Sequence, residues 1–199
     1  WYRQMVGISS IGDTTVVSDK WMLGTRNSFF VGIIATLLAT ALGTVAALGL
    51  SRPHMPFKPV LMAILISPMI VPLIITAAGM FFFYSKIGLT HSYLGLILAH
   101  TALGTPFVVI TVTATLTGFD TNLIRASQSL GADTMRTFFK IIMPLILPGV
   151  ISGGLFAFIT SFDEVVVVMF VGSVEQITIP KQMWAGLRQE TSPVILCMA

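Results

Sequence analysis

The chain has 199 residues, of which 55% are hydrophobic and only 10% charged, and its mean hydropathy is +0.91. Soluble domains carry about 25% charged residues, so this composition excludes an ordinary soluble protein and indicates a bilayer as the solvent. The net charge of +3 comes from scattered Lys and Arg residues without a basic run. Membrane lipid, and no nucleic acid, is therefore the expected partner of these charges.

The single cysteine, Cys197, cannot form an internal disulfide, and no Cys or His spacing indicates a metal site. The chain starts without Met and without the pattern of a signal peptide, and it ends in an apolar stretch after Pro193. We therefore expect both ends to be cut from a longer protein.

Four long apolar segments follow one another along the chain, at residues 29–50, 60–84, 93–117 and 145–172, and the first three contain no Asp, Glu, Lys or Arg. At about 1.5 Å per residue, each can cross the roughly 30 Å hydrocarbon core as a helix. The sequence therefore predicts an all-α, polytopic transmembrane helical bundle, with residues 1–199 forming one domain of at least four spans.

Prolines interrupt two of these segments. The second contains Pro68 and Pro72, and the third contains Pro106. Such breaks persist in a membrane only where neighbouring helices or water satisfy the freed backbone groups, so we expect bends here, either as static kinks or with a part in gating. Asn27 or Ser28 is expected to cap the first helix.

Charge does not orient the chain in the membrane, because the basic residues are almost evenly divided between the two sides. Arg52, Lys58, Arg125, Arg136 and Lys140 lie on one side, and Arg3, Lys20, Arg26, Lys86, Lys181 and Arg188 lie on the other.

The longest internal polar segment, residues 118–144, lies between the third and fourth spans. Asp120 is expected to cap a first short helix, and Gly131 to end it in the left-handed conformation. Asp133 is expected to cap a second helix that ends at Met143. The result is a helix, turn, helix at the membrane surface. It is either a groove for a partner or an amphipathic connector.

This loop resembles a known motif. The residues Arg125-Ala126-Ser127, then Gly131 after three residues, then Ile141-Ile142-Met143-Pro144 after nine more, resemble the E-A-A-x3-G-x9-I-x-L-P loop. That loop is typical of inner-membrane permease subunits of binding-protein-dependent ABC importers. Ser161-Phe162-Asp163-Glu164-Val165 and other flanking stretches extend the resemblance over nearly the whole chain, and they are most similar to the polyamine (spermidine/putrescine) branch.

The resemblance implies a type I, MetI-like fold of about six spans, so the first and last spans are expected to lie outside this chain. It implies that the loop is cytoplasmic and couples the permease to an ATPase, a role that falls on Arg125, Ala126, Ser127, Gly131 and Pro144. Arg125 replaces the motif's Glu and Ser127 its second Ala, so partner contacts are expected to differ in detail.

The resemblance also implies partners. These are ABC ATPase subunits inside the cell, a second permease subunit (a copy of this chain or a different one) and an extracytoplasmic solute-binding protein. The chain contains no Gly-x4-Gly-Lys-Ser/Thr loop, so ATP and Mg are expected on the ATPase and no cofactor on this chain. The implied location is the inner membrane.

An acidic pair, Asp163 and Glu164, lies in the fourth apolar segment. An ionised group costs about 2.5–3.5 kcal/mol near the centre of a membrane helix, so both should face protein or water. At 100° per residue, Glu164 shares a face with the small residues Gly149, Gly153, Ala157 and Ser161, and Asp163 shares one with Phe156, Thr160 and Phe170.

Carboxylates and aromatic faces both attract ammonium groups, which suggests a substrate pathway for a cationic solute along the face of Asp163. The alternative is a structural acid without substrate contact. His100, in the third span, is expected to be a hydrogen-bonded packing residue, because no other titratable group accompanies it there.

The sequence thus predicts a permease subunit that moves polyamines or a related cationic solute by alternating access. An ABC permease for another small solute and an autonomous ion-coupled carrier remain open. An enzyme is not expected, since the chain has neither a His-Glu-x-x-His nor a Gly-x-Ser-x-Gly motif.

Overall fold

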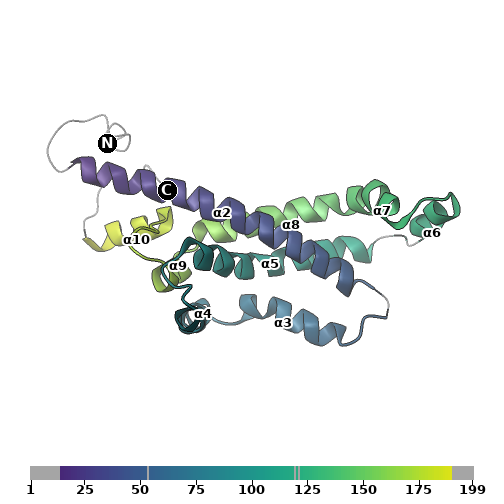
Figure 1. Ribbon diagram of the computed structural model, residues 1–199, viewed down its shortest axis with the longest axis horizontal. Helices are drawn as coiled ribbons and strands as arrows, with labels where there is room; N and C mark the ends of the chain where they lie inside the picture. Colours follow the sequence, from purple (N-terminus) through teal and green to yellow (C-terminus); the bar gives the residue numbers. More distant parts are fainter. Residues whose placement is uncertain (1–13, 53, 119, 121, 190–199) are drawn as a thin grey trace.

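The computed structural model describes residues 14–52, 54–118, 120 and 122–189, and all regular structure in that part is helical, as predicted (Figure 1). The elements are α2 (Thr14–Leu50), α3 (Lys58–Ile70), α4 (Leu73–Ile87), α5 (Tyr93–Thr117), α6 (Asn122–Ser129), α7 (Thr134–Thr137), the π-helical turn η1 (Phe138–Ile142), α8 (Met143–Asp163), α9 (Val166–Val171) and α10 (Ile179–Gln189).

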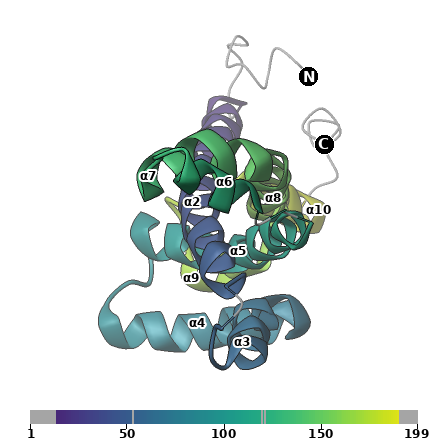
Figure 2. The ribbon, with the colours of Figure 1, turned by 90° about the vertical axis from the view of Figure 1, so that its right-hand side faces the viewer.

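The long helices α2, α5 and α8 lie side by side and make the most extensive helix contacts of the described chain (Figures 1 and 2). Residues 19–50, 93–117 and 134–163 form helices that are long and apolar enough to cross a membrane. The pair α3 and α4 passes the same test as a unit and supplies the fourth predicted span.

Small residues let α8 approach α5 closely. Gly149, Gly153, Ala157 and Ser161 are all buried, as the predicted stripe requires. A Cβ added at Gly153 would lie 2.8 Å from the backbone Cα of Val108, and one at Gly104 would lie 3.0 Å from the Cβ of Ala157. In lipid, where apolar burial gives little driving force, such backbone-to-backbone packing stabilises the helix pair.

The second span is not one helix over 60–84. It breaks at Val71 and Pro72, where α3 and α4 meet at 104°, so that α4 lies across the end of α3 (Figure 2). Pro72 lacks an N–H group and favours extended backbone at the preceding residue, and Val71 has φ −73° and ψ 134°. The expected bend is confirmed here, whereas α5 continues through the buried Pro106 without a break.

The first helix begins at Thr14 in the described chain, well before the predicted residue 29. Asn27 and Ser28 therefore lie inside α2 and do not cap it, which corrects the prediction. The Nδ2 of Asn27 donates to the carbonyls of Glu175 and Ile177, and the backbone N–H of Ile179 donates to Ser28 Oγ. These side chains hold the segment before α10 against α2.

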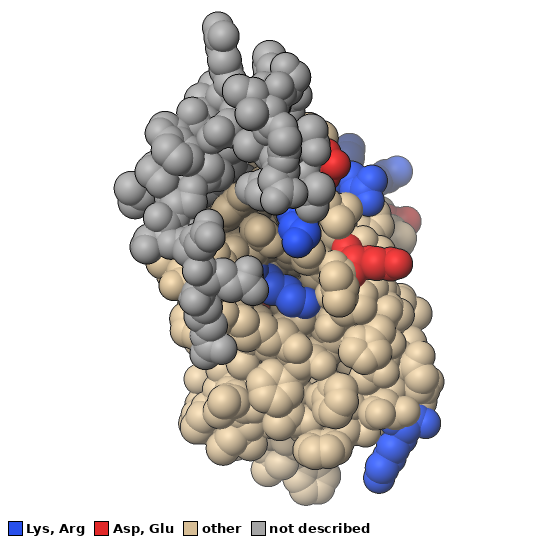
Figure 3. Space-filling model, turned by 90° about the vertical axis from the view of Figure 1, so that its left-hand side faces the viewer, with Lys and Arg blue, Asp and Glu red and all other residues tan. Residues whose placement is uncertain are grey.

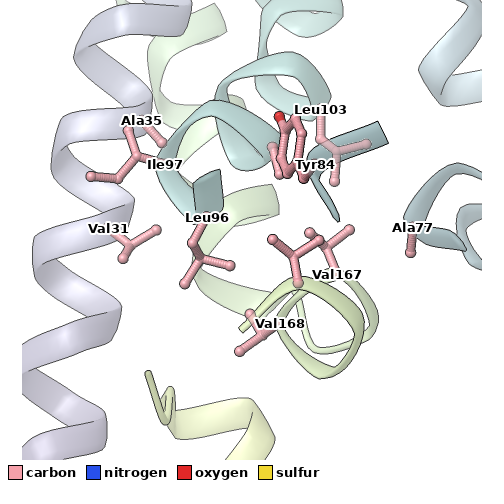
Figure 4. Close-up of a cluster of buried hydrophobic side chains, with 11 residues drawn as sticks. Val31, Ala35, Ala77, Tyr84, Leu96, Ile97, Leu103, Val167 and Val168 are labelled. Atoms are coloured by element: carbon pink, nitrogen blue, oxygen red, sulfur yellow. The ribbon is translucent and has the colours of Figure 1, made fainter. Parts of the chain in front are cut away.

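A cluster of buried apolar side chains joins α2, α4, α5 and α9 at the end of the bundle that carries α10 (Figure 4). Figure 3 shows the molecule from that end, where charged side chains gather over the upper part of the face and most of the lower part is uncharged. Lys181 of α10 donates from Nζ to the carbonyl of Ser173 at 2.9 Å, and burial lowers its pKa.

We predict that Gly153→Ala destabilises the bundle by about 1–3 kcal/mol, because the new methyl group would overlap the backbone at Val108. The matched control is Gly79→Ala in α4, where a Cβ would meet nothing within 4 Å. That control should be neutral or stabilising by up to about 1 kcal/mol, since Ala favours helix over Gly. Thermal unfolding of the purified protein in detergent measures both, and equal melting temperatures would contradict the packing.

Candidate functional site

The acidic pair lies at a second helix break. The predicted single helix over 145–172 is wrong, because α8 ends at Asp163 and α9 begins at Val166. Glu164 between them is extended, with φ −74° and ψ 121°, and is only 7% exposed. Its Oε1 accepts a hydrogen bond of 2.9 Å from the backbone N–H of Val167. The carboxylate thus satisfies a donor that would otherwise be unpaired at the start of α9.

Two adjoining hollows open beside this break. The larger, of about 390 Å³, is lined by Pro68, Met69, Ile70, Val71, Pro72, Leu73, Leu103, Phe107, Thr160 and Glu164. The smaller, of about 310 Å³, is lined by Leu73, Ile159, Thr160, Asp163, Glu164, Val165 and Val166. Leu73, Thr160 and Glu164 belong to both. The break in the second span therefore faces the break in the fourth.

The other side chains of the predicted pathway are dispersed. Asp163 is exposed and lines the smaller hollow together with Thr160. Phe156 lies outside the lining but stacks on Phe107, with ring centroids 6.2 Å apart and planes at 19°. Phe170 lies beyond the break and packs against the core cluster, because the interruption ends the 100° repeat on which the shared face was predicted.

Sequence reasoning missed the part of the lining that comes from the broken second span and from α5, namely Val71, Pro72, Leu73, Leu103 and Phe107. The twin prolines at 68 and 72 were the available signal. They indicated a bend, but apolar residues gave no indication of which helix the bend would face.

His100 is buried between helices, as predicted. Its Nδ1 lies 2.7 Å from Ser161 Oγ, which joins α5 to α8 one turn before the break. The expectation of a hydrogen-bonded packing residue is confirmed.

The polar loop forms the capped turns that the sequence predicts. Asp120 Oδ1 accepts from the N–H of Asn122, Asp133 Oδ1 accepts from the N–H of Arg136, and Gly131 has a φ of +77°. The second helix does not end at Met143, however. It passes through η1 into α8, and the wider π-helical turn stands just before Pro144, which has no N–H to offer to the preceding turn.

The predicted coupling residues divide into exposed and buried groups. Arg125 and Ala126 are exposed on α6, whereas Ser127 is buried, with its Oγ 2.9 Å from Thr137 Oγ1. Leu130, which the sequence did not single out, is 89% exposed in the turn directly after α6.

Residues 39–199 match the family model described as the inner membrane component of binding-protein-dependent transport systems. The chain belongs to this family.

Several curated relatives are similar to this permease over most of its length. The spermidine/putrescine transport system permease protein PotC of Haemophilus influenzae is 31% identical over 182 residues, which cover 92% of this chain and 71% of the relative. PotC of Escherichia coli K12 is 29% identical over 182 residues, which cover 92% of this chain and 69% of the relative. The putrescine transport system permease protein PotI of Escherichia coli K12 is 28% identical over 190 residues, with 91% and 67% covered.

The two candidate regions of this multi-pass inner-membrane permease lie toward opposite ends of the bundle. The polar loop with α6 and α7 forms one end, and the break between α8 and α9 lies toward the end that carries α10 (Figure 1). The second half of the polar loop, α7 with η1, is continuous with α8, so one helix runs from Thr134 to the break after Asp163.

We predict that Glu164→Ala lowers stability by about 1–3 kcal/mol, because it leaves the Val167 N–H without its acceptor in an apolar setting. Glu164→Gln keeps a carbonyl oxygen at the same place, so it should lose clearly less stability than Glu164→Ala. Melting temperatures in detergent measure the difference. Equal losses in the two variants would show that the hydrogen bond does not hold the break together.

Proposed function

We propose that this permease subunit carries polyamines such as spermidine or putrescine into the cell, driven by ATPase subunits that dock on its α6. The observation that carries the substrate proposal is the pair of carboxylates at the break, beside hollows in an otherwise apolar bundle. The names of the similar permeases support the same solute class.

Asp163 is the side chain best suited to bind an ammonium group. It is exposed, it lines the smaller hollow, and among the described residues its carboxylate has no hydrogen-bond donor. A carboxylate without a protein donor keeps its oxygens free to accept hydrogen bonds from an ammonium group. Glu164 adds a second negative group next to it, although one of its oxygens is engaged by Val167.

The apolar part of the lining suits the methylene segments of a polyamine. Leu73, Ile159 and Val166 lie beside the two carboxylates and offer nothing to a compact, strongly hydrated inorganic cation. The stacked rings of Phe107 and Phe156 lie next to the larger hollow, where a ring face can attract a second ammonium group by about 0.5–2 kcal/mol. Alternating charged and apolar contacts match the alternating structure of the solute.

Coupling to the ATPase is proposed to occur through the exposed face of α6. Leu130 would enter an apolar pocket of the ATPase, with Arg125 and Ala126 beside it. Ser127 acts indirectly in this proposal, because its buried hydroxyl fixes α6 on α7. Gly131 and Pro144 shape the turn and the entry into α8, so a push on α6 reaches the acidic break through a continuous helix.

The remaining partners follow from this mode of action. ATP and Mg would be bound by the ATPase, a soluble binding protein would deliver the solute from outside, and a second permease chain would complete the pathway. Alternating access would then consist of movements at the α3–α4 break against the α8–α9 break.

We predict that Asp163→Asn lowers ATP-dependent spermidine uptake at least about tenfold, the effect of about 1.4 kcal/mol of lost interaction with the cation. The matched control is Asp19→Asn, which removes another exposed carboxylate that does not line either hollow. Uptake by the full-length permease with its partners in proteoliposomes measures the effect. Unchanged uptake in Asp163→Asn would remove this residue from the pathway, and uptake without ATP would favour the ion-coupled carrier.

We predict that Leu130→Ala reduces solute-stimulated ATP hydrolysis at least about fivefold, as expected when a buried apolar anchor worth 1 kcal/mol or more is removed from an interface. Leu145→Ala, on the lipid-exposed side of α8, is the matched control. The preference for spermidine over an uncharged solute should not change. A changed preference, or equal hydrolysis in both variants, would contradict the coupling role.

A further inference from the structure

A third hollow, of about 390 Å³, lies at the end of the bundle that carries the polar loop. It is enclosed by the ends of α2 and α5 and by α6, α7 and η1. Its lining consists of Leu48, Ser51, Arg52, Leu116, Ile124, Gln128, Thr134, Thr137, Phe138 and Ile142. The volume falls within the range of about 300–1,000 Å³ that is typical of small-molecule sites.

The polar side of this hollow carries a basic side chain and a hydroxyl group without a hydrogen-bond partner. Ser51 Oγ is buried and has no hydrogen-bond partner in the described part of the chain. Arg52 is exposed, and no acidic side chain among the described residues pairs with it or lines the hollow. A guanidinium group beside an unpaired hydroxyl is suited to the oxygen atoms of a phosphate.

The other side of the hollow is apolar. Leu48, Leu116, Ile124, Phe138 and Ile142 form it. Because the membrane helices α2 and α5 end here, at Leu50 and Thr117, the hollow lies where hydrocarbon gives way to headgroups. Free phosphate would leave this apolar side in contact with water, whereas a phospholipid would cover it with the upper part of an acyl chain.

We propose that this hollow binds an anionic phospholipid of the leaflet next to the polar loop, with its phosphate on Arg52 and Ser51. Basic pockets between membrane helices on the cytoplasmic side are suited to such headgroups. The lipid would join the end of α2 to Gln128 of α6 and Thr134 of α7. Since α6 otherwise packs mainly on α7 and η1, the lipid would hold the contact surface in place.

The first test is native mass spectrometry of the assembled transporter during titration with phosphatidylglycerol and, for comparison, phosphatidylcholine. Arg52→Gln should weaken retention of phosphatidylglycerol about fivefold, the loss expected for one basic side chain at an anionic headgroup. Lys58→Gln, which removes an exposed charge at the start of α3 and outside the hollow, should leave retention unchanged. Equal retention in the two variants, or equal retention of both lipids, would overturn the proposal.

The second test identifies the occupant directly. A photoreactive benzoylphenylalanine at position 128 in the full-length, assembled transporter should form adducts with phospholipid. Because α6 is also the proposed ATPase contact, ATPase adducts beside lipid adducts are expected, whereas adducts with a second permease chain or with another segment of this chain and none with phospholipid would overturn the proposal. Neither measurement depends on which solute is transported, so the lipid site can fail or stand independently of the polyamine proposal.

Discussion

The structure depends on one constraint, which is that a helix inside a membrane can break only where other groups take over its backbone hydrogen bonds. At the break after Asp163 the Glu164 carboxylate accepts from the Val167 N–H. At the other break, proline removes one N–H altogether, and Val71 keeps its bond to the Ser67 carbonyl. Both breaks face the same hollow, so an acidic side chain that a bilayer would reject is retained where it both caps a helix and lines a cavity.

Around these breaks the helices are held together by small residues and by an interhelical hydrogen bond. Gly153 allows α8 to approach Val108 of α5, and His100 bonds Ser161 just before α8 ends. The contact between α5 and α8 is therefore close up to the point where the chain turns into Glu164. One continuous helix, from Thr134 to Asp163, begins in the polar loop and ends at the cavity, so a movement of the loop can reach the cavity through it.

Much of this arrangement could be predicted from the sequence. The parts that were not predicted were missed for physical reasons. Apolar length predicts the spans, and the caps at Asp120 and Asp133 depend only on local spacing. The start of α2 was misjudged because Asn27 bonds a segment 148 residues away, at Glu175, and no local pattern reveals such a partner. The break after Asp163 was missed because, from sequence alone, Glu164 looks like a buried ionisable residue in a continuous helix. Only its hydrogen bond to the Val167 N–H shows that it caps a new helix.

The central claim is that the two facing breaks line the path of the solute. The most direct measurement uses the assembled transporter with all native cysteines, Cys197 included, replaced by Ser, and labels Thr160→Cys with a membrane-impermeant thiol reagent. A cysteine at the exposed, lipid-facing position 151 is the comparison. If the breaks line the path, only the cysteine at 160 reacts, its reaction rate depends on the bound nucleotide, and spermidine protects it from the reagent. A cysteine at 160 that stays unreactive in every nucleotide state would contradict the account.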